Sequence, residues 1–228
     1  MQIYSKNRMA GICLLAAFLA LTTTAKGQPE KIIQPRLADM VEGKGLRVVN
    51  RAVSPLREKN RQGLRFDERK EHGIAWLEGV RFGNGTIELD IRGRDELQKS
   101  FVGIAFHGVD DQTFETIYFR PFNFQALDSI RRIHAVQYTF EPGASWEKLR
   151  KEHPGQYEKS VNPAPGPTDW FHARIEINMP TIRVFVNNAP QPSLVVESLS
   201  SHREGALGLM VGNQSNGDFA NLKIMPAR

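Results

Sequence analysis

Alternation of apolar and polar residues with a period of two dominates this chain. Its clearest instance is the stretch 85–93, in which Ile87, Leu89 and Ile91 alternate with polar or charged neighbours. A period of two places successive side chains on opposite faces and predicts a half-buried strand. The same reasoning predicts ten more strands, at 46–50, 74–77, 101–107, 115–120, 135–141, 171–178, 181–186, 193–197, 206–211 and 219–225.

Strands that follow one another without intervening helices are typical of an all-β fold in which antiparallel sheets pack as a sandwich or close as a barrel. The strands at 171–178 and 181–186 are separated only by a tight turn that contains Met179 and Pro180, so we expect them to form a hairpin.

One stretch departs from this pattern. In residues 144–153, Trp146 and Leu149 lie at helical spacing among charged residues, which predicts a short amphipathic helix. The helix falls in an insertion over residues 142–169, and the proline-rich part of that insertion, 162–167, cannot join a sheet because proline lacks the backbone donor. Trp146 is expected either to close over a groove or to fasten the helix to the sandwich.

The N-terminus has the pattern of a secretory signal peptide. Lys6 and Arg8 precede an apolar run over 9–21 and a small-residue segment over 22–27, with Ala25-Lys26-Gly27 as the expected cleavage site. The apolar run is too short to span a bilayer, so we expect release into the periplasm or the cell exterior. The expected organisation is a signal peptide at 1–27, a lead-in at 28–45 and one β-sandwich domain at 46–228.

Composition narrows the possible partners. The chain has 30 basic and 25 acidic residues, but removal of the three basic residues of the leader leaves 27 against 25. A nearly neutral chain with scattered charges gives no electrostatic basis for nucleic acid or for a membrane partner. The only cysteine, Cys13, lies in the leader, which excludes disulfides and thiolate chemistry from the exported part.

A candidate groove follows from the strand pattern. If the apolar residues face the core, their alternating partners project together from the opposite face, which is expected to be polar, with Ala105 leaving room for a ligand. Tyr118 would offer a ring for sugar stacking, and the other side chains would offer directional hydrogen bonds. The candidate binding residues are His107, Tyr118, Arg120, Asn123, Gln137, Thr139 and Trp146.

The later half of the chain carries recognisable motifs, at 169–177, 182–188, 205–209 and 217–224. With them, residues 72–226 resemble the concanavalin-A-like lectin/glucanase superfamily, especially its laminin-G-like and keto-disaccharide-hydrolase-like branch of exported bacterial proteins. Asn188 stands where this family usually has glycine, a tolerable change because Asn also adopts positive φ. The resemblance implies a jelly-roll of two antiparallel sheets, one of them concave, with ligands lying across the concave face.

The most tempting catalytic motif is incomplete. Glu88-Leu89-Asp90 is similar to the start of the family-sixteen glycoside hydrolase signature, Glu-x-Asp-x-x-Glu, but Gly93 stands at the general-acid position. We therefore assign Glu88 and Asp90 to a solvated strand face. If the chain is an enzyme, the candidate catalytic residues are His107, Glu115 and Glu141.

Three functions remain open. The leading hypothesis is an exported protein that binds a carbohydrate ligand without a cofactor. The alternatives are a glycoside-processing hydrolase of the keto-disaccharide-hydrolase-like group, for which two carboxyl groups would share one pocket, and a laminin-G-like adhesion module, which would present a flat apolar patch. Asp110 and Asp111 are candidate calcium ligands, although adjacent aspartates in a turn usually serve the turn itself.

Overall fold

The computed structural model describes residues 1–3, 32–43 and 45–227. Residues 4–27 of the expected signal peptide and residues 28–31 of the lead-in lie outside the described ranges. No helix in the described ranges is long and apolar enough to cross a membrane.

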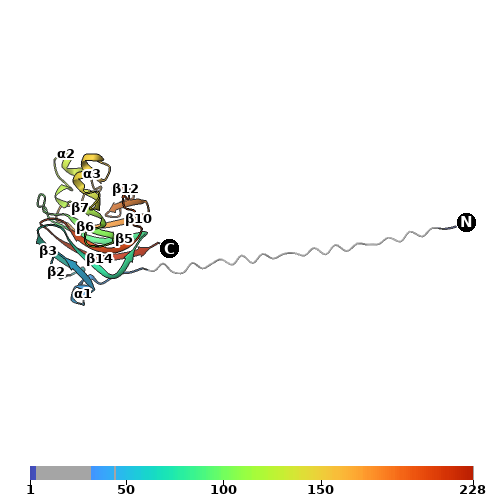
Figure 1. Ribbon diagram of the computed structural model, residues 1–228, viewed down its shortest axis with the longest axis horizontal. Helices are drawn as coiled ribbons and strands as arrows, with labels where there is room; N and C mark the ends of the chain where they lie inside the picture. Colours follow the sequence, from blue (N-terminus) through green and yellow to red (C-terminus); the bar gives the residue numbers. More distant parts are fainter. Residues whose placement is uncertain (4–31, 44, 228) are drawn as a thin grey trace.

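Two seven-stranded antiparallel sheets pack face to face (Figure 1). The first sheet has the order β12-β11-β10-β5-β14-β3-β2, and the second has the order β1-β4-β13-β6-β7-β8-β9. The predicted all-β sandwich is therefore confirmed. The strands are β1 (Leu46–Val49), β2 (Val53–Glu58), β3 (Arg61–Arg69), β4 (Gly73–Phe82), β5 (Gly85–Arg92), β6 (Val102–Gly108), β7 (Phe114–Phe119), β8 (Val136–Glu141), β9 (Glu158–Lys159), β10 (Phe171–Asn178), β11 (Thr181–Val186), β12 (Leu194–Glu197), β13 (Gly205–Val211) and β14 (Ser215–Pro226).

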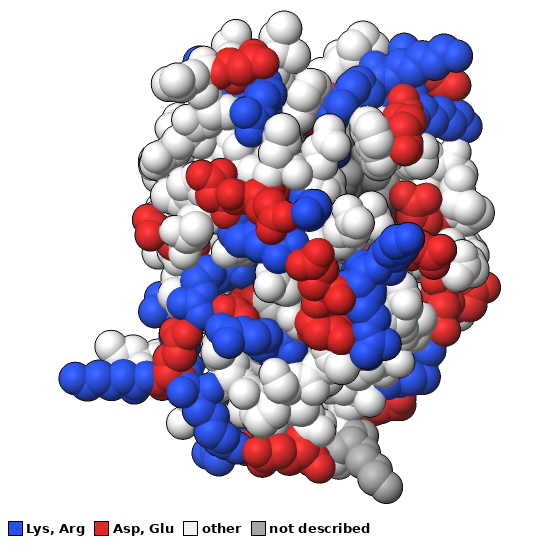
Figure 2. Space-filling view, turned by 90° about the vertical axis from the view of Figure 1, so that its left-hand side faces the viewer, with Lys and Arg blue, Asp and Glu red and all other residues white. Residues whose placement is uncertain are grey.

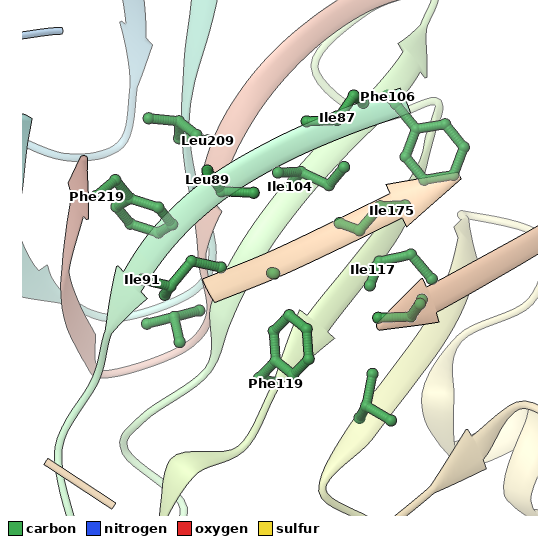
Figure 3. Close-up of a cluster of buried hydrophobic side chains, with 14 of the residues drawn as sticks. Ile87, Leu89, Ile91, Ile104, Phe106, Ile117, Phe119, Ile175, Leu209 and Phe219 are labelled. Carbon is green, nitrogen blue, oxygen red and sulfur yellow. The ribbon is translucent and has the colours of Figure 1, made fainter. Parts of the chain in front are cut away.

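The core lies between the sheets and is built from the inward half of each alternating strand. Figure 3 shows Ile87, Leu89 and Ile91 of β5 meeting side chains from β6, β7, β10 and β13. These residues are almost fully buried. Their burial removes apolar surface from water, which is the main favourable contribution to folding, and it explains why the period of two located these strands. The expected hairpin is also present, since Asn178 pairs with Thr181.

Three strands were not predicted: β2, β3 and β9. Only Leu56, Leu64 and Phe66 are buried hydrophobic residues within β2 and β3, and charged residues surround them. Pro55 fits because β2 is an edge strand, where a missing backbone donor costs little. Gly63 is required by packing, because a Cβ atom there would collide with the backbone of β14.

Helices are short and peripheral. The predicted helix in the insertion is α3 (Trp146–Glu152), while α1 (Leu37–Glu42), α2 (Ser129–Arg132) and the 3-10 turn η1 (Pro121–Asn123) were not expected. In Figure 1, α2 and α3 lie together at one end of the sandwich. The end of the lead-in is ordered, because Ile33 bridges to Ile224 of β14.

The outer face of the first sheet is covered by paired charges. Asp90 contacts Arg61, His172 and Asn221, and Glu88 lies 3.5 Å from the Lys223 amine. Both carboxylates therefore lie on the polar strand face to which we assigned them. In Figure 2, blue and red side chains are interspersed on the face in view rather than gathered into a block of one sign.

Trp170 marks one end of this charged face. The guanidinium carbons of Arg61 and Arg92 lie 4.9 and 4.6 Å from the centre of its ring, and its indole N–H donates to Glu58. Trp170 is thus held by cation–π contacts and a hydrogen bond on the first sheet.

Candidate functional site

A pocket of about 510 Å³ opens on the outer face of the second sheet. Strands β7, β8 and β13 contribute to it, together with the turn before β4 and the start of α3. Its aromatic lining residues are Phe101, Phe114, Tyr118 and Trp146. Its polar lining residues include Glu71, His72, Gln112, Thr116, Thr139, Glu141, Ser145, Glu147 and Asn213.

The floor of the pocket belongs to an apolar cluster on the outer face, which consists of Ile74, Trp76, Ala105, Phe114, Tyr118 and Met210. Gly108 and Gly208 let the ring of Trp76 lie against the sheet, because a Cβ atom at either position would meet that ring within 3 Å. The prediction that this outer face is polar is wrong for the centre of the face. The centre is apolar and aromatic, and the polar side chains lie around it.

Aromatic rings line this floor at different angles. Phe101 packs edge-on against Tyr118 at 6.0 Å between ring centres, and His72 packs edge-on against Phe114 at 5.6 Å. Trp146 is 40% exposed, unusually open for a residue of this size beside a pocket. Rings of this kind offer large, rigid contact surfaces to the apolar face of a ligand.

The wall that carries Trp146 is anchored by a buried ion pair. Arg150 of α3 donates two hydrogen bonds, of 2.8 and 2.7 Å, to the carboxylate of Glu158 on β9. Burial opposes ionisation of Glu158, but the hydrogen bonds and charge of Arg150 together with the charges of His134 and Arg120 outweigh it and lower the pKa of Glu158. The guanidinium carbon of Arg150 lies 4.8 Å from the ring centre of Trp146, so this pair holds the indole at the pocket edge.

Arg120, Gln137 and Asn123 do not line the pocket as expected. Arg120 is buried behind Tyr118, where it donates to the phenol oxygen at 2.9 Å and to the amide oxygen of Gln137 at 3.3 Å. Gln137 is fully buried, and Asn123 fixes the loop before β8 through a bond to the carbonyl of His134. These residues support the pocket from behind. Burial also raises the pKa of Tyr118 to about 12.

His107 and Glu115 lie between the two sheets, which contradicts our placement of His107 in the groove. The pairing of β13 with β6 shifts register around His107, whose φ is +50°, and this irregularity turns the imidazole inward. Glu115 faces the core because it has the same parity on β7 as Ile117 and Phe119. Both side chains are completely buried, so neither can touch a ligand in the pocket.

These two residues belong to what we call the buried network: His107, Glu115, Tyr138 and Ser198. The imidazole Nδ1 lies 2.7 Å from one Glu115 oxygen, and Nε2 lies 3.0 Å from the Gly83 carbonyl. The other Glu115 oxygen accepts from the Tyr138 and Ser198 hydroxyls at 2.5 and 2.6 Å. The network joins the second sheet to the segment that follows β12.

The structure does bring four of the expected residues together in the pocket: Tyr118, Thr139, Glu141 and Trp146. Burial raises the pKa of Glu141, a bond from Thr139 partly offsets this, and the nearby carboxylate of Glu147 raises it further. Glu141 and Glu147 therefore lie close together in the pocket, and Glu141 is disposed to hold a proton. Such a group can donate a hydrogen bond or act as a general acid.

Replacing Glu141 with glutamine should change how stability depends on pH. Because its pKa is raised in the folded state, the contribution of Glu141 is fully present below the unfolded pKa of about 4.3 and is lost as the pH rises through the folded value. The stability of E141Q relative to wild type should therefore increase from acidic to neutral pH, as measured by urea unfolding. A difference that is the same at every pH would contradict the raised pKa.

Asp110 and Asp111 have protein partners. Asp110 accepts from the backbone N–H groups of Gln112 and Thr113, as in an ordinary turn, and Asp111 accepts from Arg47 and from the indole of Trp76. Across the described ranges, no group of three His, Cys, Asp or Glu side chains is placed to hold a metal ion. This arrangement lends no support to the calcium hypothesis.

Several pocket residues were missed by sequence reasoning. Phe114 and Met210 carried a usable signal, because they have the outward parity of their strands. His72 and Asn213 lie in turns next to strands, where no periodicity indicates which way a side chain points. Glu147 was seen only as a charged residue of the predicted helix.

The fold and the pocket define the class: a concanavalin-A-like jelly-roll sandwich with an aromatic pocket on the outer face of one sheet. The chain matches the family model described as "3-keto-alpha-glucoside-1,2-lyase-like domain" over residues 41–225, and it belongs to that family. No curated protein matches the chain.

Solved structures agree on the fold. The carbohydrate binding module CBM66 from Bacillus subtilis superposes with a TM-score of 0.52 at 14% identity, covering 79% of this chain and 95% of that one. A Bacillus subtilis protein of unknown function with a galectin-like fold gives a TM-score of 0.58 at 10% identity, covering 85% and 94%. A putative glycosyl hydrolase from Parabacteroides distasonis gives 0.50 at 14% identity, covering 76% and 90%. At these identities the likeness concerns the fold alone.

Proposed function

We propose that this chain is an exported carbohydrate-binding protein that holds a glycoside in the pocket between Tyr118 and Trp146. The observation that carries the proposal is the pairing of exposed aromatic surface with hydrogen-bonding groups in one cavity. A pyranose presents apolar C–H faces and a rim of hydroxyls, so it needs both kinds of contact. Family membership adds support, because the family is named for a glucoside. The leader pattern supports export to the periplasm or the cell exterior.

Direct binding tests this proposal. Isothermal titration of the purified protein with a panel of glucosides and their 3-keto derivatives should give saturable binding to at least one member. Binding should be displaced by excess of the same sugar and should disappear when Tyr118 and Trp146 are both replaced with alanine. If no sugar of the panel binds, or if the double variant binds as well as wild type, the pocket does not serve as a glycoside site.

A second function is favoured by Glu141 and Glu147, whose carboxyl groups share the pocket. A ketone at C3 of a glucoside acidifies the hydrogen on C2. One carboxylate can remove that proton while a carboxylic acid protonates the glycosidic oxygen, so that the C1–O bond breaks, a C1–C2 double bond forms and the aglycone leaves as an alcohol. We propose Glu141 as the acid, because burial favours its protonated form.

Product analysis separates binding from catalysis. Incubation with a 3-keto-glucoside, followed by mass spectrometry, should release the aglycone if the chain is an enzyme. Glu141→Gln should then abolish release while the sugar still binds, whereas Glu204→Gln on the far surface should leave the rate unchanged. Binding without any product from the wild-type protein would reject the catalytic function and leave the binding function standing.

A further inference from the structure

The pocket has an unusual charge balance. Three carboxylate side chains line it, those of Glu71, Glu141 and Glu147, and the described lining residues include no lysine or arginine. Burial lowers the pKa of His72 and so disfavours its positively charged form. A ligand in this pocket therefore meets acidic side chains at the rim and aromatic faces below it. A bound cation would favour the ionised form of Glu141, against the burial that raises its pKa.

Two arginines near the pocket are held behind its wall, and the guanidinium of a third, Arg51, donates to the backbone carbonyls of Glu71 and Gly212. Arg120 is buried and bonded to Tyr118, Gln137 and the carbonyl of His134. Arg150 is held in its two-bond pair with Glu158. Protein acceptors engage the N–H groups of Arg120 and Arg150. Neither guanidinium is therefore free to bind the carboxylate or sulfate of a ligand in the pocket.

This arrangement discriminates between ligands by charge. A uronic acid or sulfated sugar would be taken out of water beside carboxylates with no cation to pair with, which is costly. A protonated amine would gain charge-assisted hydrogen bonds from the carboxylates and cation–π attraction from the exposed side of Trp146, whose ring also meets the guanidinium of Arg150. Both contacts act in the same direction.

We propose that the pocket prefers glycosides that carry a protonated amino group, such as 2-amino-2-deoxy sugars, and rejects anionic sugars, with Glu141 and Glu147 as the residues that set this preference. The inference rests on the proposed glycoside-binding function and specifies its ligand class. It places the ammonium at the carboxylate rim and the apolar face of the sugar ring against the aromatic lining.

Three matched trisaccharides test the inference by titration near neutral pH: β-1,4-linked glucose, its 2-amino-2-deoxy analogue and its glucuronate analogue. The amino sugar should bind about tenfold more tightly than the neutral one, the value expected for one charge-assisted contact. The glucuronate should bind most weakly. High salt should reduce the advantage of the amino sugar, because it screens partly exposed charges.

Variants of pocket residues test whether the preference for the amino sugar arises in the pocket. The double variant Glu141→Gln with Glu147→Gln should remove the advantage of the amino sugar over the neutral sugar. Trp146→Ala should weaken all three ligands. Equal affinity of wild type for the three sugars, or an advantage that survives in the double variant, would overturn the inference while glycoside binding stands. Failure of all three to bind would remove the proposed function for these sugars and the inference with it.

Discussion

Glu115→Ala is expected to lower the free energy of unfolding by about 3 to 5 kcal/mol, because each buried polar group that loses its partner costs about 1 to 3 kcal/mol. Glu115 is completely buried and is held by His107, Tyr138 and Ser198. Its removal leaves the Nδ1 atom of His107 and two hydroxyls in the interior without their Glu115 partner and opens a cavity between the sheets. Urea unfolding followed by tryptophan fluorescence would measure the loss.

Two further variants keep this prediction testable if the alanine variant does not fold. Ser198→Ala removes only one donor to Glu115 and should cost about 1 kcal/mol. Glu204→Ala removes an ion pair with Arg81 in which both side chains are about two-thirds exposed, and it should be nearly neutral. If Glu115→Ala were as mild as Glu204→Ala, the buried network would not contribute to stability in the way its hydrogen bonds indicate.

Trp146→Ala is expected to weaken glycoside binding by about thirtyfold, equivalent to about 2 kcal/mol, because truncation removes a large aromatic contact at the mouth of the pocket. The folded state should tolerate the change, since the ring is 40% exposed. Titration with the tightest-binding sugar of the panel would measure the effect, and the circular dichroism spectrum should remain that of wild type.

Trp170 provides the matched control for this variant. It is also a partly exposed tryptophan, but it lies on the first sheet between Arg61 and Arg92. Trp170→Ala should leave affinity for the sugar unchanged. If the two alanine variants weakened binding equally, the sugar would not be held specifically against Trp146.

The strands with apolar inward faces were predictable because burial imposes a period of two on their sequence. Residues 53–69 were not predicted as strands, because β2 and β3 bury few side chains and include Pro55 and Gly63. An edge position explains the proline, and a close approach to β14 explains the glycine. Both are properties of the assembled sheet, and neither produces an alternating pattern in the sequence.

The site was predictable in part for the same reason. Tyr118, Thr139 and Glu141 follow the outward parity of β7 and β8, so alternation placed them together. His107 was misplaced because one irregularity in β6 reverses the direction of its side chain, and such a feature depends on pairing with β13. His72 enters the pocket from a turn that approaches the sheet only after folding.

The pocket is formed by two parts of the chain that contribute differently to folding. Its floor consists of strand residues in a sheet whose other face forms the core, so a change there endangers folding. Its wall comes from the insertion between β8 and β10, which is tied to the sandwich by the two residues of β9, by the pair of Arg150 with Glu158 and by the buried side chains of Leu149 and Tyr157. A change in the insertion between β8 and β10 can therefore alter which ligand is bound while the sheet that forms the floor stays the same.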